Sequence, residues 1–523
     1  MSFIAMDSSK FRTHHGQHSA TFTPAPTDHF LTIPQIHEFN AQHSPDHPLF
    51  VYVDDDGKEV IINVHEDGKL HPSSPDSDAQ PLVIGILAVA DTISYMCATV
   101  GIMLLGFAPF PISPRNSAAA VAHLVKATGL KHMLVSPDIS MQRLSEEVAE
   151  SLAKDNTEFD VLPMVDFEEL FPSDDQEAPI LDAPVRQFGA EEVALILHSS
   201  GSTAFPKPIR IRAKTFVQWG YYLSFGEVDF CDLRLSLQTA PVFHALGMMP
   251  VAFTATAGVI LTCYKPSVLP VVPTPENFLT SLVATRSDVA YCVPAFIEAW
   301  ARDPENIPTL QGLKAVIYGG APLHPETGER LTKAGVNLVP FYGATEVGGI
   351  GVLVPKAKPT LDTVGYFSFS AQVDVVLRPQ GGADDLFEPV FLESNPDLHS
   401  LNASTGVVNG HRAYETKDLV QRHPTIPHLW RVYGRTDDQI MLSTGEKTNP
   451  GPIEGILTLD PHVSAALMFG RGKFQNGVLV QPAPAYAFDP SDLERLEAFR
   501  NTIWPTVEKA NTFAPSHSRL FKE

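Results

Sequence analysis

His198-Ser-Ser-Gly-Ser-Thr-Ala-Phe-Pro-Lys207 follows directly on the apolar run 193–197, and this junction is the most informative feature of the sequence. An apolar strand that enters a hydroxyl-rich turn predicts a phosphate-binding loop, because backbone N–H groups and hydroxyls can surround phosphate oxygens. The lysine at its end adds a mobile positive charge. A Walker A loop is excluded, since that motif needs Gly-Lys-Ser/Thr where Pro206, Lys207 and Pro208 stand. A polar surface loop without a ligand remains the alternative.

Three downstream regions also place ligand-binding residues after predicted strands. The glycines of Ile317-Tyr-Gly-Gly-Ala-Pro-Leu323 would let a flat ligand approach the backbone closely. Phe341-Tyr-Gly-Ala-Thr-Glu-Val-Gly-Gly349 adds a ring that can stack on a base and a carboxylate that can hold Mg²⁺. Tyr414-Glu-Thr-Lys-Asp418 and Gly434-Arg-Thr-Asp-Asp-Gln-Ile440 add an acid and an arginine, which suit a ribose diol and a phosphate. Together these regions predict a nucleotide site.

Composition favours a large globular enzyme over a nucleic-acid-binding protein. The 523 residues are 44% hydrophobic, and 37 Lys plus Arg against 60 Asp plus Glu give a net charge of −23. A nucleic-acid surface would need a basic field that this balance does not supply. The four cysteines have no C-x-x-C spacing, so we expect reduced core thiols and a cytoplasmic location.

Neither a membrane span nor a metal cluster is expected. Residues 82–107 are apolar, but Asp91 and two glycines interrupt them, so we expect a buried helix and strand there. The N-terminus has no basic region followed by an apolar stretch, which a secretory signal would need. His14, His15 and His18 could bind a metal, but their polar N-terminal segment favours solvated side chains.

Buried apolar runs that alternate with helical segments predict a parallel α/β core. One of these helices is expected to open at Ser113-Pro114 and to close at Gly129. From Thr363 onward the pattern becomes rich in strands. Ligands of parallel sheets bind at the carboxyl ends of the strands, which is where the motif residues fall. The apolar runs are 82–89, 133–135, 193–197, 259–262, 289–293 and 315–317, and the later strands include 372–377 and 429–433.

The order of these motifs resembles the adenylate-forming superfamily of acyl-CoA synthetases, luciferases and adenylation domains of nonribosomal peptide synthetases. Within it, four phrases are similar to the adenylation domain of fungal carboxylic acid reductases. The resemblance runs from about residue 30 to residue 523. The phrases are Phe110-Pro-Ile-Ser-Pro-Arg-Asn116, Ala240-Pro-Val-Phe-His-Ala-Leu-Gly-Met248, Gly445-Glu-Lys-Thr-Asn-Pro450 and Ser516-His-Ser-Arg-Leu-Phe-Lys-Glu523.

The resemblance implies two domains. Residues 1–434 would form a large N-terminal core of parallel α/β subdomains plus a β-barrel-like part, with residues 1–30 mobile. Residues 435–523 would form the hinge, at Asp437, and a truncated small α+β domain.

The activity that the resemblance implies is ATP-dependent activation of a carboxylic acid to acyl-AMP with release of pyrophosphate, assisted by Mg²⁺. Catalysis would come from holding two anions in line and neutralising phosphate charge, without a protein nucleophile. The acyl group would then pass to phosphopantetheine on a carrier domain, and an NADPH-dependent reductase domain would release the aldehyde. Both domains are expected in the same polypeptide outside this chain, while nucleic acid and membranes are not expected as partners.

Matching positions carry the family roles onto this chain. Thr345 would contact the α-phosphate and Glu346 the Mg²⁺, and these two with Lys207 and His244 would be the catalytic residues. The ribose would fall to Asp418 and a further nucleotide contact to Arg435. The other ATP-binding and AMP-binding residues would be His198, Ser199, Ser200, Gly201, Ser202, Thr203, Gly320, Ala321, Pro322, Tyr342, Gly343, Ala344 and Tyr433. The alternatives are a structural ion pair for Asp418 and Arg435, a core aromatic for Tyr342 and a solvated carboxylate for Glu346.

His244 carries the prediction about the substrate. Domains that activate α-amino acids usually place an aspartate after the phenylalanine that corresponds to Phe243, to bind the ammonium group. A histidine can instead donate a hydrogen bond to a carboxylate, so we expect an aromatic or apolar acid. The other pocket residues would be Met248, Phe296, Ile317, Gly319, Gly320 and Gly349. A core histidine without a ligand role remains the alternative.

Two departures from the family pattern bear on activity. Ala204 stands where the family loop usually has glycine, and its Cβ would cost about 1 kcal/mol if that position needs a positive φ. We also find no match to the late lysine of the small domain, because Lys447, Lys509 and Lys522 lie in other contexts. The sequence therefore favours a fragment of a reductase. A free-standing aryl- or acyl-CoA ligase and a catalytically impaired nucleotide-binding protein stay open as alternatives.

The hinge prediction is testable by limited proteolysis. We expect the first cut to fall within residues 435–438, because a boundary between domains that rotate is a region of low local stability. Mass spectrometry of the fragments would locate the cut. An intact boundary with earlier cuts elsewhere would weaken the two-domain interpretation.

Overall fold

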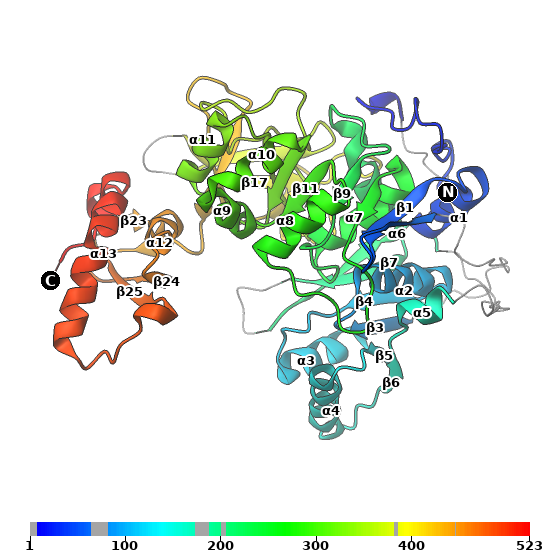
Figure 1. The fold of residues 1–523 in the computed structure, drawn as a ribbon, viewed down its shortest axis with the longest axis horizontal. Helices are drawn as coiled ribbons and strands as arrows, with labels where there is room; N and C mark the ends of the chain where they lie inside the picture. The colour runs from blue at the N-terminus through cyan, green and yellow to red at the C-terminus, as the bar shows by residue number, and fades with distance from the viewer. Residues whose placement is uncertain are drawn as a thin grey trace. The chain divides into compact units, whose positions relative to one another are not determined.

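The computed structural model describes residues 8–63, 82–172, 188–199, 205–380, 385–444 and 446–522. Its contacts divide the chain into two compact units. The first unit comprises Met1–Asp374 and Phe391–Tyr414, and the second comprises Val375–Val390 and Glu415–Glu523. Figure 1 shows helices and strands alternating along the first unit, as the predicted α/β class requires.

A seven-stranded sheet forms the centre of the first unit, in the order β13-β12-β11-β9-β10-β1-β2. All neighbouring pairs are parallel except β1 with β2, which is an antiparallel edge pair. The predicted parallel core is therefore confirmed for this sheet. The bounds are β1 Pro48–Val53, β2 Glu59–Asn63, β9 Arg234–Ser236, β10 Ile260–Thr262, β11 Val289–Cys292, β12 Ala315–Gly319 and β13 Leu338–Phe341.

Both faces of this sheet are buried, which explains the uninterrupted apolar runs of its strands. In β12, Ile317 joins a core cluster with α7, whereas Val316 and Tyr318 join another cluster with α8 and α9. Helices cover the two faces accordingly (Figure 1). Their bounds are α1 Ile33–His43, α6 Ala213–Tyr221, α7 Ala245–Ala257, α8 Pro275–Ala284, α9 Pro294–Arg302, α10 Ile307–Gly312 and α11 Pro325–Lys333.

A second parallel sheet has four strands in the order β4-β3-β5-β6. The helices α3 and α4 pack together beside β5 (Figure 1). The sequence predicted that α3 opens at Ser113-Pro114, but it begins at Ala118, because the Ser117 side chain accepts the Ala120 N–H as N-cap. Gly129 closes it with φ +68°, as predicted. The bounds are β3 Val83–Leu87, β4 Ala108–Pro111, β5 His132–Val135, β6 Asp160–Pro163, α2 Thr92–Leu104, α3 Ala118–Thr128, α4 Ile139–Ala153 and α5 Phe167–Leu170.

The strand that precedes the predicted phosphate loop differs from the other core strands. β7 (Val193–His198) pairs antiparallel with β8 (Pro208–Arg212), so its inclusion among the parallel strands was wrong. The chain turns back after only nine residues, which is too short for the crossover that a parallel neighbour needs. The loop is therefore a hairpin turn between two strands.

The N-terminal segment packs on the first unit where residues 8–30 are described. Phe11 stacks on Tyr221 with ring centroids 5.4 Å apart. His15 is buried, with Nδ1 3.0 Å from Asp229, so the prediction of solvated histidines is wrong for His15. The sequence could not reveal this contact because its partners lie more than 200 residues apart.

The second unit combines antiparallel strands with a small helical layer. β20 (Asp418–Arg422) pairs with β21 (Trp430–Arg435), and β24 (Val463–Phe469) pairs with β25 (Gly477–Pro482). α12 (Pro450–Thr458) and α13 (Leu493–Phe513) pack together with β24 around a core that includes Leu457 and Val507. Thr448 and Ser518 hydroxyls lie 2.8 Å apart, which joins two of the phrases that carried the resemblance. The second unit also holds β22 Ile440–Met441 and β23 Lys447–Thr448, and four further strands of the chain are β16 Asp374–Pro379, β17 Leu386–Leu392, β18 Gly406–Val408 and β19 His411–Glu415.

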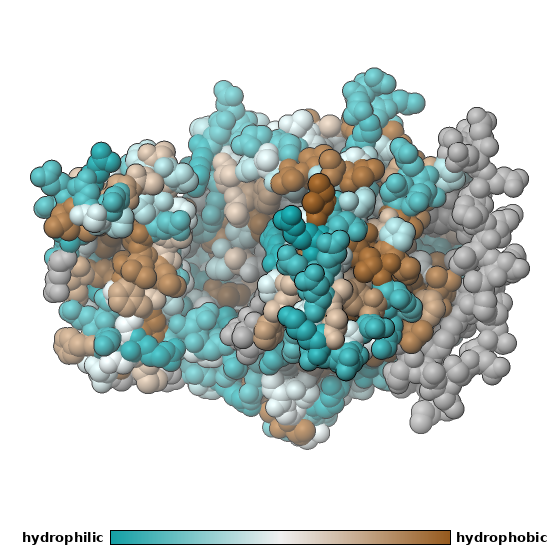
Figure 2. All heavy atoms as spheres, turned by 90° about the horizontal axis from the view of Figure 1, so that it is seen from below, coloured by the Kyte–Doolittle hydropathy of each residue, from teal (hydrophilic) through white to brown (hydrophobic). Residues whose placement is uncertain are grey.

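The surface and the cysteines agree with the composition. Figure 2 shows hydrophilic residues over much of the face that it draws, with smaller hydrophobic patches among them. Cys231, Cys263 and Cys292 are buried and Cys97 is half-buried, and none of these four described cysteines forms a disulfide, so the predicted core placement is confirmed for the three buried ones. Across the described ranges, no helix has the length and apolar character to cross a membrane, and no three His, Cys, Asp or Glu side chains gather as metal ligands would.

Close contact between α6 and α7 depends on Gly220, which gives a stability prediction. A Cβ there would lie 2.8 Å from the Thr256 hydroxyl and 2.9 Å from the Ala252 carbonyl oxygen. We expect Gly220→Ala to lower the unfolding free energy by about 1–3 kcal/mol through overpacking. Gly101→Ala in α2 is the matched control, since a Cβ there meets nothing within 4 Å. It should gain up to about 1 kcal/mol from helix propensity. Equal unfolding midpoints in urea for both variants would contradict this packing.

Candidate active site

The carboxyl ends of the parallel strands form one edge of the seven-stranded sheet. The segments that leave β9, β11, β12 and β13 at this edge carry the residues that the sequence singled out. The register confirms their proximity, because Ile317 lies opposite Val339 and Gly319 opposite Phe341. Leu246, near the start of α7, lies 3.3 Å from the place of a Cβ on Gly319. Several loops therefore converge on one place.

The predicted phosphate hairpin is described only at its two ends. Ser199 donates its N–H to the Lys207 carbonyl oxygen at 3.1 Å, which closes the turn, and the Lys207 side chain is exposed. Phe205 stacks on His123 of α3 with ring centroids 5.3 Å apart. Ser200, Gly201, Ser202, Thr203 and Ala204 lie outside the described residues, so their predicted contacts remain predictions.

His198 has a fixed tautomer at the end of β7. Its Nε2 accepts the Ser113 N–H at 3.0 Å, so the proton lies on Nδ1, which faces the Ser199 carbonyl oxygen at 3.3 Å. Burial lowers the pKa of His198 below its ordinary value. The ring is only 3% exposed and thus acts as a neutral support for the strand end.

His244 stands at the N-cap of α7, beside His198, with ring centroids 6.3 Å apart. Burial lowers the pKa of His244 to about 4, and the neighbouring His198 and Arg115 act in the same direction. The imidazole is therefore neutral at physiological pH and can donate one hydrogen bond. This is the chemistry that the sequence predicted for a contact with a carboxylate.

The structure brings together some of the predicted pocket residues but not all. Met248 and Ile317 are fully buried in one cluster, and Gly319 lies next to Leu246. Phe296 instead packs on Phe278 and Trp300 in the cluster on the other face of the sheet. The prediction placed Phe296 in the pocket, whereas the helix face that it occupies puts its ring in this cluster.

The predicted adenine-binding segment is open to solvent. Gly320 has φ +84°, a conformation that favours glycine, and a Cβ there would meet only Val293 at 4.0 Å. Ala321 and Pro322 are exposed. Tyr342 is 8% exposed and its ring lies 4.9 Å from that of Phe367. An accessible backbone thus lies at the end of β12, one strand away from a buried aromatic ring.

The glycines of 343–349 are explained by packing. β14 (Gly343–Ala344) pairs with β15 (Gly348–Gly349), which makes a tight hairpin. A Cβ on Gly348, with φ +80°, would lie 2.6 Å from Trp219 Nε1, and one on Gly349 would lie 2.9 Å from the Tyr222 ring. The hairpin therefore packs directly on α6 and on the short 3-10 helix Tyr222–Phe225 that follows it.

Thr345 and Glu346 occupy the tip of this hairpin and are half-buried. Asn402, which the sequence reasoning missed, donates its side-chain amide to the Thr345 carbonyl oxygen at 2.7 Å. Its backbone N–H reaches the Glu346 carbonyl oxygen at 2.8 Å. His399 Nε2 donates to the Val347 carbonyl oxygen at 2.7 Å. Three successive carbonyls are thus held by one segment more than 50 residues away, which no local pattern could reveal.

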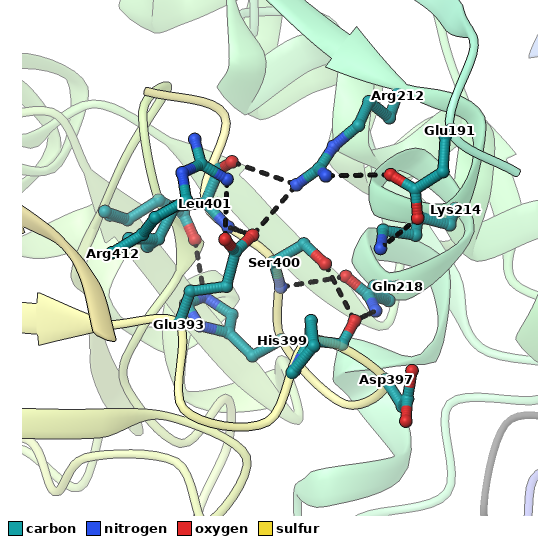
Figure 3. A network of polar contacts seen from close by, with 12 residues as sticks. Glu191, Arg212, Lys214, Gln218, Glu393, Asp397, His399, Ser400, Leu401 and Arg412 are labelled. Atoms are coloured by element: carbon teal, nitrogen blue, oxygen red, sulfur yellow. Dashed lines mark hydrogen bonds and ion pairs between the residues drawn. The ribbon is translucent and has the colours of Figure 1, made fainter. Parts of the chain in front are cut away.

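A network of ions lies behind that segment (Figure 3). The Glu393 carboxylate accepts from Arg212 at 2.9 Å, from Arg412 at 2.5 Å and from the Leu401 N–H at 3.0 Å. Arg212 also reaches Glu191 at 2.9 Å. The Ser400 N–H donates to the side-chain carbonyl oxygen of Gln218 at 2.9 Å, which connects α6 to the same segment. No local sequence pattern predicted this network.

The second unit brings Asp418 and Arg435 together, as their predicted roles require. Arg435 lies 3.4 Å from Asp418 and makes a two-point contact with Asp437 at 2.9 and 3.0 Å. The hydrogen bond from Arg435 lowers the pKa of Asp437, although burial opposes it. Tyr433 is half-buried, and its carbonyl oxygen accepts from Asn449. This geometry equally fits the alternative of a structural ion pair.

The residues fit Mg²⁺ that is bound together with a nucleotide. Mg²⁺ usually takes one or two carboxylates plus substrate phosphates, rather than a cage of protein ligands. Glu346 supplies one half-buried carboxylate at the strand-end edge, where the described residues offer no cluster of three ligands. Glu346 would hold the ion, and the ion would supply positive charge to the phosphates.

Comparison with protein families and known proteins identifies relatives. Residues 83–383 match the model described as AMP-binding enzyme, and residues 437–523 match the AMP-binding enzyme C-terminal domain. The chain is 41% identical to adenylate-forming reductase Nps10 of Heterobasidion annosum, over 97% of this chain and 47% of that protein. It is 27% identical to a carboxylic acid reductase of Neurospora crassa, over 82% of this chain and 40% of that protein. The chain thus spans about half the length of the curated relatives it matches.

Solved structures show the same fold. The anthranilate CoA ligase AuaEII with anthranoyl-AMP gives a TM-score of 0.68 at 14% identity, covering 94% of this chain and 92% of that one. The A-PCP didomain of the carboxylic acid reductase from Segniliparus rugosus, in complex with AMP, gives 0.66 at 14% identity, covering 94% and 76%. The predicted adenylate-forming fold is confirmed.

The lowered pKa of His244 predicts how stability depends on pH. The pKa of His244 is lower in the folded than in the unfolded protein, so its neutral ring contributes fully to the unfolding free energy above the unfolded pKa of 6.5. This contribution is lost as the pH falls toward the folded pKa of about 4. Between pH 7.5 and pH 5 the loss is about 2 kcal/mol. We expect His244→Gln to remove that part of the pH dependence in urea unfolding.

His37 on α1 is the matched control for this experiment. Burial lowers its pKa to about 4 as well, so His37→Gln should reduce the pH dependence similarly. Only His244→Gln should also weaken binding of a carboxylic acid. Identical pH profiles of wild type and His244→Gln would contradict the assignment of a buried, neutral imidazole.

Proposed function

The chain belongs to the AMP-binding enzyme family, and on that premise we propose that it activates a carboxylic acid with ATP, forming acyl-AMP and pyrophosphate. The observation that carries this proposal is the convergence of the Gly320, His244 and Glu346 segments at the carboxyl edge of one parallel sheet. Such edges are where α/β sheets bind nucleotides. The relatives named above support the reaction class.

In the proposed reaction, a carboxylate oxygen of the acid attacks the α-phosphorus of ATP and pyrophosphate leaves. His244, being neutral, donates a hydrogen bond that orients the carboxylate without adding a charge to the pocket. The Thr345 hydroxyl contacts the α-phosphate and Lys207 the β- and γ-phosphates, together with Ser199 and the remainder of its hairpin. Their contribution is the neutralisation of charge as the new bond forms.

The adenine is proposed to lie on the exposed backbone of Gly320, Ala321 and Pro322, near Tyr342, with Gly343 and Ala344 beside it. For the second unit, we retain the proposal that Asp418 binds the ribose hydroxyls, while Arg435 and Tyr433 contact the nucleotide. Asp437 is retained as the hinge between residues 1–434 and 435–523.

The acid is proposed to be aromatic or apolar. The pocket side of β12 offers Ile317 and Gly319, and α7 offers Met248, all of them buried and none charged. An ammonium group would find no carboxylate in the segment 243–248. This supports a simple carboxylic acid over an α-amino acid.

The fate of the acyl-AMP belongs to the whole protein. By similarity to the reductases, we propose transfer to phosphopantetheine on a carrier domain, followed by NADPH-dependent reduction to the aldehyde, both in the same polypeptide. The lack of a disulfide among the four described cysteines supports a reducing, cytoplasmic location. Transfer to free CoA is the second candidate, favoured by the likeness in fold to CoA ligases.

The direct test is acid-dependent ATP–pyrophosphate exchange with benzoic, cinnamic and aliphatic acids, with hydroxylamine to trap the acyl-AMP. Exchange that requires an acid supports activation. Nucleotide binding without exchange for any acid, also in a chain extended C-terminally, would favour the impaired nucleotide-binding protein. Acyl-CoA formation without a carrier would favour the ligase.

Glu346 gives the sharpest single substitution. We expect Glu346→Gln to lower the exchange rate by about 100-fold or more and to raise the Mg²⁺ concentration needed for half-maximal rate, because the charge that holds the ion is lost. Glu276→Gln, on the exposed first turn of α8, is the control and should change neither quantity. Equal Mg²⁺ dependence in wild type and Glu346→Gln would remove Glu346 from the site.

A further inference from the structure

Glu393 is a buried carboxylate that no part of the proposed reaction uses. It follows β17, its side chain is 8% exposed, and it accepts hydrogen bonds from two arginines and one backbone N–H. Burial alone would raise its pKa, but the hydrogen bonds from Arg212 and Leu401 and the charge of Arg412 outweigh burial and lower it. Glu393 is therefore ionised, and its position is fixed from three directions.

On one side, the contacts of Glu393 lead through Arg212 to the predicted phosphate hairpin. Arg212 ends β8 and is the N-cap residue of α6, five positions after Lys207. It is held between Glu393 and Glu191, each at 2.9 Å, and Lys214 pairs with Glu191 as well. The outgoing strand of the hairpin is thus anchored at the Glu393 carboxylate (Figure 3).

On the other side, the contacts of Glu393 lead to the hairpin tip that carries Thr345 and Glu346. Glu393 accepts the Leu401 N–H, and the next residue, Asn402, holds the carbonyls of Thr345 and Glu346. His399 adds a hydrogen bond from its Nε2–H to the Val347 carbonyl oxygen, and burial lowers the pKa of its imidazole. The segment 399–402 therefore connects Glu393 to the backbone of the tip through hydrogen bonds of 2.7 to 3.0 Å.

We propose that Glu393 is a positioning residue, which sets the Thr345–Glu346 tip and the Lys207 hairpin at a fixed separation so that both can contact one triphosphate. This inference rests on the proposed function, because only a shared nucleotide requires the two loops to keep one separation. Glu393 touches neither nucleotide nor acid. Its effect passes through Arg212 on one side and through Leu401 and Asn402 on the other.

Two variants of the full chain test this role. Glu393→Gln keeps the shape of the side chain but removes the charge that two arginines share. Asn402→Ala leaves every ion pair in place and removes the side-chain amide that holds the Thr345 carbonyl. It carries the test alone if Glu393→Gln does not fold. The control is Glu59→Gln, which removes another Arg–Glu pair, that of Glu59 on the edge strand β2 with Arg234 at the start of β9, at 2.6 Å.

The first measurement is MgATP affinity by calorimetry at several Mg²⁺ concentrations, with the thermal midpoint recorded for each variant. We expect Glu393→Gln and Asn402→Ala each to weaken binding about tenfold or more, since a small misplacement of a binding group has effects of this size. The double variant should be no weaker than the poorer single variant, because both act through one segment. Glu59→Gln should lower only the thermal midpoint.

In the exchange assay, the same two variants should raise the KM for ATP and lower kcat, with the KM for the acid unchanged. Wild-type MgATP affinity in both variants, or additive losses in the double variant, would overturn the positioning role. If wild type binds MgATP but shows no acid-dependent exchange, the proposed function fails, and the affinities still decide the role of Glu393. If wild type does not bind MgATP, both proposals fail.

Discussion

Parallel pairing of β9, β11, β12 and β13 is the constraint on which the rest of the first unit depends. Parallel strands all end at the same edge of the sheet, so the loops that follow them lie close together there. The segments after these strands supply the N-cap histidine of α7, the exposed Gly320 backbone and the hairpin tip with Glu346. The packing of both sheet faces holds this register, because a slip would move Ile317 and Val316 into core clusters that are packed around other side chains.

Near the carboxyl ends of these strands, the buried histidines are neutral whereas the Glu393 carboxylate is ionised. His198 and His244 are kept uncharged by burial, so they can support and orient groups without attracting counter-ions. Glu393 stays charged because two arginines surround it. Arg212 and Arg412 supply positive charge near the site in a protein whose net charge is −23. Both arginines are already paired with glutamates.

The sequence predicted the strands, the strand-end glycines and the grouping of Asp418 with Arg435, because each depends on short-range pattern. It misplaced β7, since apolar character does not reveal whether a strand pairs parallel or antiparallel. It also missed the burial of His15 and the side of the sheet on which Phe296 packs, which are decided by partners distant in the chain. Asn402 and Glu393 are polar residues in an irregular segment, and nothing local distinguishes them from surface residues.

The contact of Gly348 and Gly349 with Trp219 and Tyr222 has a consequence for protein engineering. The hairpin 343–349 and the helix α6 have complementary shapes, although more than 120 residues separate them in the chain. An exchange of this hairpin between relatives would bring side chains that were fitted to a different helix surface. Chimeric enzymes built from this chain should therefore keep α6 and the hairpin from the same parent, with junctions placed outside both.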